Sequence, residues 1–365
     1  MNKKTRIVGT VTGIAAVASL KIYSDVRFGT KNCLRYANKK AKPLKKTKPK
    51  CEREADGSYS LIKDKYDEFR ILQLSDLHIG GGYLSLNEDK FAIDTIIDIV
   101  HKAQPDLVVI TGDLVYSRPN VTLSTSNLNS AKIVAKLMEK LDVWYTVTFG
   151  NHDAEYFATH TRDQLKEFFM NQKGCLLTDP APEVTGSSNH LIKVRNDDGT
   201  INTSLIMIDS NSYPDFRGRG GYDCIHDDQV KWYEKQMKRI EIEENGNNNS
   251  LMFTHIPFEE YSKAWKLYQK DSDKVKYYFG GADEAVSYSK YATRIFDKIV
   301  ELKGTKGVFC GHDHLNDFSI EYRGVRLTYG KSIDCLLYAK NLSGHRGGTL
   351  IKLDFDGSFD IQEII

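Results

Sequence analysis

Short apolar runs alternate with amphipathic stretches through the middle of this chain. In residues 87–103, Ile93, Ile96, Ile97 and Val100 follow the spacing that places side chains on one helix face. Further helical patterns cover residues 130–141, 229–244 and 291–302. Runs of strand length cover residues 70–75, 106–111, 143–149, 205–209, 251–254 and 307–310. This alternation predicts an α/β fold with βαβ units, and the short glycine-separated runs of residues 320–365 predict added antiparallel strands.

The N-terminal segment has a different pattern. Lys3, Lys4 and Arg6 precede a run over residues 7–20 that contains no charged residue. A basic start followed by a short apolar run is typical of a secretory signal, and the run is shorter than the ~20 residues of a spanning helix. We therefore expect residues 1–20 to be a signal or membrane-anchor segment. A membrane-anchored or extracytoplasmic location follows, with a cytoplasmic protein that has a membrane-touching arm as the alternative.

Charge is distributed unevenly along the chain. Residues 1–50 hold 14 Lys/Arg and one acid, or +13, and the remainder holds 37 Lys/Arg and 48 acids, or −11. Residues 21–65 are predicted to be a basic linker. Within it, the lysine-rich residues 37–50 either meet an anionic membrane surface or act as a solvated spacer. The acidic body argues against a specific nucleic-acid partner, which needs clustered basic residues.

Cysteine spacing limits the choice of site chemistry. The six cysteines include no C-x-x-C pair, which excludes zinc-ribbon spacing. Their density is too low for a disulfide scaffold, although one or two bridges remain open if the body is exported.

Aspartate, asparagine and histidine gather where the predicted strands end. The segments are Asp76-Leu77-His78, Gly112-Asp113, Gly150-Asn151-His152-Asp153, His255 and Gly311-His312-Asp313-His314. Sheets of α/β proteins place their ligands at such strand ends. Each segment alone is weak evidence, since a single histidine such as His255 is more often a core residue. Five such segments together predict a metal site, and oxygen and nitrogen donors without thiolate suit Mn, Fe or Zn.

In this order, the five segments resemble the calcineurin-like metallophosphoesterase superfamily. Its pattern is D-x-H, G-D, G-N-H-[DE], a single H and G-H-x-H, and residues 70–314 contain every block. Residues 222–233 and 311–318 also look like the purple-acid-phosphatase-like branch. The resemblance implies a four-layer α/β/β/α sandwich over residues 66–365, with two metal ions at the sheet edge.

Carried over residue by residue, the resemblance implies a role for each polar side chain. One metal ion would have the ligands Asp76, His78, Asp113 and His314. The other would have the ligands Asp113, Asn151, His255 and His312, so that Asp113 bridges the two. His152 would contact the phosphate and help to protonate the leaving group, and Asp153 would fix the ring of His152.

The first motif departs from that of the purple enzymes. They have D-x-G there and bind iron through the tyrosine of G-D-x-x-Y, whereas this chain has both His78 and Tyr116. We expect His78 to be the metal ligand and Tyr116 to pack beside it.

The resulting hypothesis is a dinuclear metal-dependent phosphoesterase. Two divalent or trivalent cations (Mn, Fe or Zn) would neutralise the phosphate and activate a shared water for in-line attack. No G-x-S-x-G motif is present, in agreement with a mechanism that needs no serine nucleophile. The alternatives are a non-catalytic scaffold of the same fold and a nuclease or phosphodiesterase. Arg217 and Arg219, in the glycine-rich loop 210–224, and the polar insert 271–287 are candidates for substrate contacts.

Overall fold

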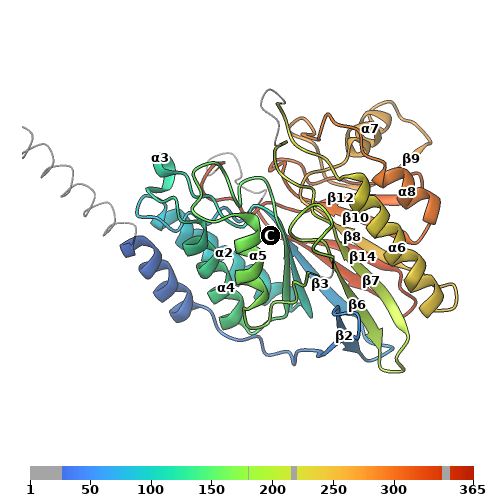
Figure 1. Cartoon of the computed structure of the whole chain (residues 1–365), viewed down its shortest axis with the longest axis horizontal. Helices are drawn as coiled ribbons and strands as arrows, with labels where there is room; N and C mark the ends of the chain where they lie inside the picture. The colour runs from blue at the N-terminus through green and yellow to red at the C-terminus, as the bar shows by residue number, and fades with distance from the viewer. Residues whose placement is uncertain (1–26, 180, 215–219, 339–345) are drawn as a thin grey trace, which may run out of the picture.

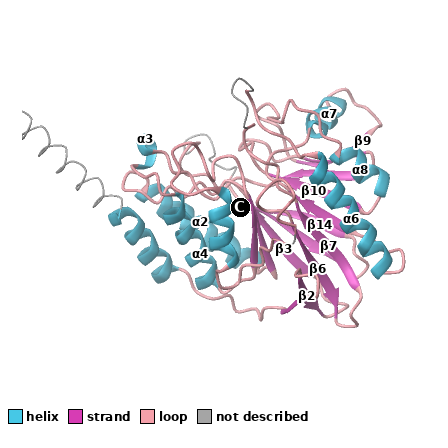
Figure 2. Ribbon diagram, viewed as in Figure 1, coloured by secondary structure: helices cyan, strands magenta, loops and turns pink. Residues whose placement is uncertain are grey.

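The computed structural model describes residues 27–179, 181–214, 220–338 and 346–365. Two β-sheets face each other at the centre, and each has helices on its outer side (Figures 1 and 2). The predicted four-layer α/β/β/α sandwich is therefore confirmed.

The five-stranded sheet carries the first three polar segments. Its order is β14 (Phe359–Ile364), β13 (Gly348–Leu353), β3 (Phe69–Leu74), β4 (Leu107–Thr111) and β5 (Tyr145–Thr148). Strands β3, β4 and β5 are parallel, so their carboxyl ends meet at one edge. Its outer helices are α2 (Leu86–Ala103), α4 (Asn127–Leu141) and α5 (Arg162–Met170), with α3 (Pro119–Thr122) at the same end.

The nine-stranded sheet carries the other two segments. Its order is β1 (Lys50–Arg53), β2 (Tyr59–Lys63), β6 (His190–Asn196), β7 (Ile201–Met207), β8 (Ser250–Phe253), β10 (Thr305–Cys310), β12 (Val325–Tyr329), β11 (Ser319–Tyr322) and β9 (Val275–Phe279). Strands β7, β8, β10 and β12 are parallel. The helices of this half are α6 (Asp227–Glu243), α7 (Glu259–Tyr268) and α8 (Ile295–Leu302).

Burial on both faces explains why the strands appear as continuous apolar runs. In β3, Ile71 belongs to the apolar cluster between the sheets, and its neighbour Leu72 belongs to the cluster beneath the helices. The two sheets are also joined by hydrogen bonds. Gln73 Nε2 donates to the carbonyl of Cys310 at 2.9 Å, and Thr146 Oγ1 lies 2.5 Å from His190 Nε2.

The C-terminal prediction is correct for strand direction within each hairpin. Strand β11 pairs antiparallel with β12, and β13 pairs antiparallel with β14. The two hairpins belong to different sheets, which the sequence pattern does not indicate.

The predicted linker over residues 21–65 is wrong for its described part. Residues 27–40 are helical, and Cys33, Ala37 and Ala41 are buried in the cluster that α2 and α4 share. Strands β1 and β2 then extend the nine-stranded sheet. The folded domain therefore begins before residue 66. The sequence does contain a signal for this packed helix, although the many lysines obscure it: small side chains recur every fourth residue, at positions 29, 33, 37 and 41.

Residues 37–50 are attached to the body at several points, although most of their side chains are exposed. The amide of Leu44 donates to the carbonyl of Leu141 at 3.1 Å, and Trp144 Nε1 donates to the carbonyl of Pro49 at 2.9 Å. Lys46 Nζ lies 2.7 Å from Asp106, and Lys48 Nζ lies 2.6 Å from Asp142. Two of the lysines assigned to an anionic membrane surface are thus paired within the protein.

Two further predictions concern the first twenty residues and the cysteines. The signal or anchor segment over residues 1–20 lies outside the described residues, and among the described helices none is long and apolar enough to cross a membrane. All six cysteines are free thiols, so the disulfides left open above are not formed.

Candidate metal centre

The five polar segments converge where the two sheets open at their carboxyl ends. Strands β3, β4 and β5 end just before Asp76, Asp113 and Asn151. Strands β8 and β10 of the other sheet end just before His255 and His312. The site therefore lies between the sheets, and neither sheet alone supplies all of its side chains.

The backbone is bent sharply at this edge. Four non-glycine residues of the segments have positive φ: Asp76 (54°), His78 (46°), Asp113 (49°) and His312 (79°). Such angles are uncommon for side chains with a Cβ and are kept where surrounding structure enforces them. A Cβ at Gly112 (φ 81°) would lie 2.4 Å from His255 Nδ1, and one at Gly311 would lie 1.8 Å from Ser75 Oγ. Only glycine permits the segments to come this close.

Asp113 occupies the middle of the cluster. Its Oδ2 lies 3.3 Å from His78 Nε2 and 3.2 Å from His255 Nε2. On one side, His314 Nε2 lies 3.5 Å from Asp76 Oδ1. The ligand atoms of Asp76, His78 and His314 all lie within 4.8 Å of one another.

The second group lies on the other side of Asp113. His255 Nε2 lies 3.2 Å from Asn151 Oδ1 and 3.3 Å from His312 Nδ1. The ligand atoms of Asp113, His255 and His312 also lie within 4.8 Å of one another. The two groups share Asp113, as the predicted bridging role requires.

The far nitrogen of several rings is held by an acceptor. His255 Nδ1 lies 2.9 Å from the carbonyl of Thr111, which leaves its Nε2 lone pair facing Asp113. Asp334 accepts from His314 Nδ1 at 3.2 Å and lies 3.5 Å from His78 Nδ1. This arrangement, in which one ring nitrogen is anchored and the other is aimed inward, is typical of metal-binding histidines.

Asp334 was missed by the sequence reasoning. It follows the end of β12 by a few residues, and the amide of Ile333 donates to the carbonyl of Ser75 at 3.0 Å. The strand-end rule that found the five segments would therefore also have found Asp334 if residues 325–329 had been identified as a parallel strand.

Charges of both signs are packed together in this buried cluster. Burial alone would lower the pKa of His255 and His314, but the carboxylates of Asp113 near the first and of Asp334 and Asp76 near the second raise both to about 9. The pKa of His312 falls to about 3 because of burial and the adjacent positive charge of His255. Burial opposes ionisation of Asp113, yet His255 and His152 lower its pKa well below the usual range. The donor set fits cations that would replace protons on these rings.

The expected contact between Asp153 and His152 is wrong. His152 Nδ1 instead hydrogen-bonds to Glu155 Oε1, and Glu155 also forms a two-point ion pair with Arg118. The carboxylate of Asp153 accepts backbone N–H groups from Gly150 at 2.7 Å and from Asp113 and Val115 at 3.1 Å each. Asp153 therefore binds two loops together. The sequence signal for Glu155 is its i+3 spacing from His152.

Comparison with known proteins agrees with this geometry. Residues 69–316 match the family model described as Calcineurin-like phosphoesterase. The chain belongs to the calcineurin-like phosphoesterase family. "Probable inactive purple acid phosphatase 14" of Arabidopsis thaliana is 29% identical over 294 residues, which cover 72% of this chain and 69% of that protein. "Phosphatase DCR2" of Saccharomyces cerevisiae is 27% identical over 72% of this chain and 47% of that protein. The predicted resemblance, including the purple-acid-phosphatase-like branch, is confirmed.

A solved structure supports the fold of this calcineurin-like phosphoesterase. The dimetal phosphatase from Danio rerio aligns with a TM-score of 0.51 at 10% identity, covering 81% of this chain and 96% of that one. At this level of identity the likeness concerns the fold alone.

Three tyrosines lie beside the candidate metal ligands of this calcineurin-like phosphoesterase. The ring of Tyr116 lies 5.5 Å from that of His78, which itself points into the cluster. Asn151 Nδ2 donates to Tyr213 Oη at 3.1 Å, so Asn151 Oδ1 faces His255 and is the atom available to a metal ion. The ring of Tyr222 lies edge-on to His312 at 4.4 Å. Of the predicted substrate contacts nearby, Arg217 and Arg219 lie outside the described residues.

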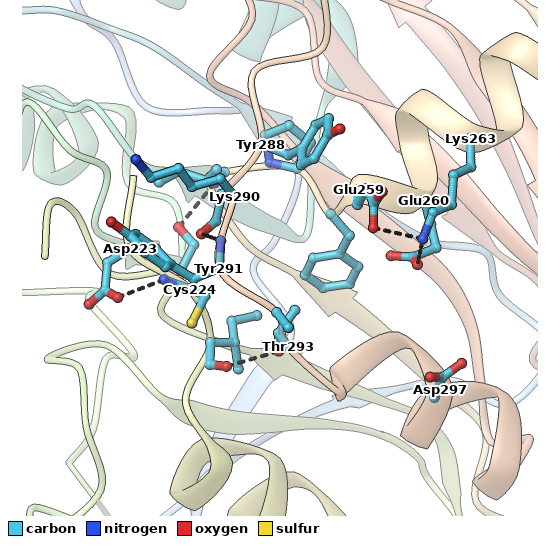
Figure 3. Close-up of a pocket in the computed structure, with 17 residues that line it drawn as sticks. Asp223, Cys224, Glu259, Glu260, Lys263, Tyr288, Lys290, Tyr291, Thr293 and Asp297 are labelled. Carbon is cyan, nitrogen blue, oxygen red and sulfur yellow. Dashed lines mark hydrogen bonds and ion pairs between the residues drawn. The ribbon is translucent and has the colours of Figure 1, made fainter. Parts of the chain in front are cut away.

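A cavity of about 430 Å³ adjoins Asp223 and Cys224, the next residues after Tyr222 in the chain (Figure 3). The carbonyl of Tyr222 accepts from Ser289 Oγ at 3.0 Å, and Ser289 lines the cavity. Its charged lining residues are Asp223, Glu259, Glu260, Lys263, Lys290 and Asp297. Carboxylates outnumber ammonium groups, so the cavity is a poor place for phosphate.

Part of the polar insert 271–287 has a structural role. Residues Val275–Phe279 form edge strand β9, and the amide of Ser287 donates to Asp313 Oδ2 at 3.0 Å. The end of the insert is thus fixed to the segment that carries His312 and His314.

Proposed function

We propose that this calcineurin-like phosphoesterase is an active phosphoric ester hydrolase with two metal ions. The observation that carries the proposal is the convergence of a full set of oxygen and nitrogen donors around Asp113. These donors belong to Asp76, His78, Asp113, Asn151, His255, His312 and His314. Two bound cations would neutralise phosphate charge and lower the pKa of a coordinated water. Mn, Fe and Zn all suit the donors.

The remaining residues of the site hold and orient the reacting groups. His152 stands at the exposed side of the cluster, with its ring 5.3 Å from that of His78 and 5.1 Å from that of Tyr116. A ring in that place can meet the ester oxygen of a substrate and give it a proton as the bond to phosphorus breaks. Glu155 anchors the far nitrogen of that ring, and Asp153 keeps the loops that carry Asp113 and Asn151 in register.

A non-catalytic scaffold is the second candidate, because relatives such as the Arabidopsis protein are named probable inactive phosphatases. In this chain each donor position is filled by a residue that can bind a metal ion. The scaffold proposal would therefore require loss of turnover without loss of the metal site.

The test is metal analysis of the purified protein combined with hydrolysis of para-nitrophenyl phosphate and its bis ester under added Mn, Fe or Zn. Two metals per chain with turnover support the hydrolase, and the preferred ester separates phosphatase from phosphodiesterase. Two metals without turnover on either ester would favour the scaffold, and absence of metal under every condition would refute both.

Variants assign the roles within the site. Asp113→Ala is expected to lose both metals because its carboxylate lies between the two groups. His152→Ala is expected to keep both metals and to lose turnover. Metal loss in His152→Ala would contradict the role given to this ring.

A further inference from the structure

The helix at residues 27–40 separates small side chains from basic ones. Two rows repeat every fourth residue and so lie on different faces. The row of Gly29, Cys33 and Ala37 is buried, and the row of Arg27, Lys31, Arg35 and Lys39 is exposed. The small row packs toward α2, where Cys33 Sγ lies 3.7 Å from Asp89 Oδ2 and Tyr36 Oη donates to Asp94 at 2.6 Å. The basic row is therefore held facing solvent.

The helix lies in a stretch of sequence that is rich in basic residues. Residues 27–50 contain ten basic residues and no acidic one, whereas residues 51–365 have a net charge of −11. Lys31, Arg35 and Lys39 form no ion pair with any described residue, in contrast to Lys46 and Lys48. The molecule thus has one strongly basic edge on an otherwise acidic body.

Exposed apolar side chains stand next to the basic row. Phe28, Tyr83 and Leu84 are 52%, 46% and 54% exposed, and the rings of Phe28 and Tyr83 lie 6.0 Å apart. They are held in place because Thr30 Oγ1 donates to the carbonyl of Gly81 at 2.7 Å. An open groove of about 680 Å³ beside them is lined by Phe28, Leu34 and Lys31, among others.

We propose that the basic face, defined as Lys31, Arg35 and Lys39 with Phe28, Tyr83 and Leu84, docks on an anionic phospholipid bilayer. Lysine and arginine meet the negative headgroups, and the apolar side chains enter the boundary between headgroups and acyl chains. A nucleic acid would use the cations but would leave Leu84 without a role. The acidic body is repelled by the same surface, so docking has one orientation. The helix at residues 27–40 lies on the opposite side of the molecule from α6 (Figure 1).

The first test measures binding of the full chain to vesicles of phosphatidylcholine with and without phosphatidylserine. The variant Lys31→Gln/Arg35→Gln/Lys39→Gln is expected to bind the anionic vesicles roughly a hundredfold more weakly, because each cation near such a surface contributes a several-fold factor. The matched control is Lys231→Gln/Lys235→Gln/Lys238→Gln, which removes the same charge from exposed positions of α6. It is expected to bind like the wild type. An unchanged melting temperature and an unchanged far-UV circular dichroism spectrum show that both variants fold.

The second test separates the basic face from residues 1–26, which remain present in the full chain. A polarity-sensitive fluorophore is attached at Leu84→Cys or, as control, at Ile242→Cys on α6, in a background where Cys51 and Cys224 are replaced by serine. Ile242 is 80% exposed. The expected result is a phosphatidylserine-dependent increase in fluorescence at position 84 alone, reduced by added salt.

Three results would overturn the proposal. They are equal responses at positions 84 and 242, equal vesicle binding by the triple variant and the wild type, and loss of DNA binding in the triple variant without any response to vesicles. The last result would identify the basic face as a nucleic-acid surface. None of these measurements depends on metal occupancy, so the docking surface and the proposed hydrolase activity are tested independently.

Discussion

Asp334 is the residue that most clearly links the proposed metal site to the body of the protein. Its carboxylate receives His314 Nδ1 at 3.2 Å and faces His78 Nδ1 at 3.5 Å. It also accepts the backbone N–H groups of Leu336, Leu337 and Tyr338, at 2.8–3.0 Å. Burial opposes its ionisation, yet the two histidines hold the pKa of Asp334 below its usual range. The carboxylate thus fixes the orientation of both rings.

Asp334→Asn is expected to weaken the binding of one of the two proposed metal ions selectively. The group of Asp76, His78 and His314 should lose about 10- to 100-fold in metal affinity, because an amide holds two imidazoles less well than a carboxylate does. The group containing His255 should keep its metal. Calorimetric metal titration of the apo protein checks this, with Asp297→Asn at an exposed position of α8 as the control. Equal weakening of both ions would contradict the assignment of Asp334 to one group.

Glu155 hydrogen-bonds to His152, the ring to which we assign the contact with substrate. Burial raises its pKa, but hydrogen bonds from His152 and Arg118 outweigh burial and keep the pKa lowered. Glu155 is therefore ionised and holds His152 Nδ1. If His152 protonates the leaving group, the benefit depends on how poor that leaving group is.

Glu155→Gln is therefore expected to reduce kcat on an alkyl phosphate by roughly a hundredfold, and to reduce kcat on para-nitrophenyl phosphate much less. Metal content should be unchanged. The measurement is kcat for both substrates, with the exposed Glu68→Gln as control. An equal loss on both substrates would show that Glu155 supports the fold rather than proton transfer.

At the residue scale, the sequence predicts which side chains gather but not which atoms touch. The five segments follow from the strand-end rule and from a specific motif order. The pairing of His152 with Glu155 rather than Asp153 depends on the turn after Asn151, where the adjacent carboxylate points back to Gly150. No pattern of residue types specifies that direction.

At the scale of the elements, one polar contact between the sheets is sensitive to pH. His190 on β6 is buried, its Nδ1 faces the carbonyl of Ser188 at 2.8 Å, and its Nε2 faces Thr146 Oγ1 on β5 at 2.5 Å. Burial lowers the pKa of His190 from 6.5 to about 4. The neutral ring can donate from Nδ1 and accept from the Thr146 hydroxyl at Nε2, so both contacts are satisfied without the extra proton that burial disfavours.

The sign of the effect follows from the lowered pKa. The neutral His190 ring stabilises the folded state fully above pH 6.5, and this stabilisation is lost as the pH falls toward 4. Because one pKa unit corresponds to 1.36 kcal/mol, the lowered pKa of His190 is worth about 3 kcal/mol of unfolding free energy. His190→Gln should therefore flatten the pH dependence of the unfolding free energy in this window. Denaturant titrations at several pH values check this, with the partly exposed His101→Gln on α2 as control. A variant with the same acid slope as the wild type would exclude His190 as its source.

Long, regular elements are the ones that the sequence predicts well. Helix α2 and strands β4 and β10 have strong periodicity or continuous apolar runs, and the structure confirms them. Strand β9 escapes prediction because it is a short, partly exposed edge strand within a longer polar insert. Strands β1 and β2 escape because the residues before them are lysine-rich and because Leu61 is their single buried apolar side chain.

At the scale of the whole molecule, the question is where the folded domain begins. Composition places the boundary at residue 66, but the helix at residues 27–40 buries Cys33 and Ala37 completely in the cluster beneath α2 and α4. Its contact with the loop after His78 is equally close, since a Cβ at Gly29 would lie 2.2 Å from the carbonyl oxygen of Gly82. The helix therefore belongs to the same packed unit as the metal site.

Packing of this helix predicts that the same substitution has different effects on stability at two adjacent positions, 37 and 38. Ala37→Glu would place a carboxylate in a fully buried apolar contact, and it is expected to lower the unfolding free energy by roughly 3 kcal/mol or to release the helix. Asn38→Glu, with the same new charge at an exposed position, is expected to behave like the wild type. Thermal unfolding together with hydrogen exchange of residues 27–40 measures both effects. A solvated linker would tolerate either change equally. A difference in stability between the two variants is therefore expected only if this segment is packed against the domain. Identical behaviour of the two variants would instead place the start of the folded domain at residue 66.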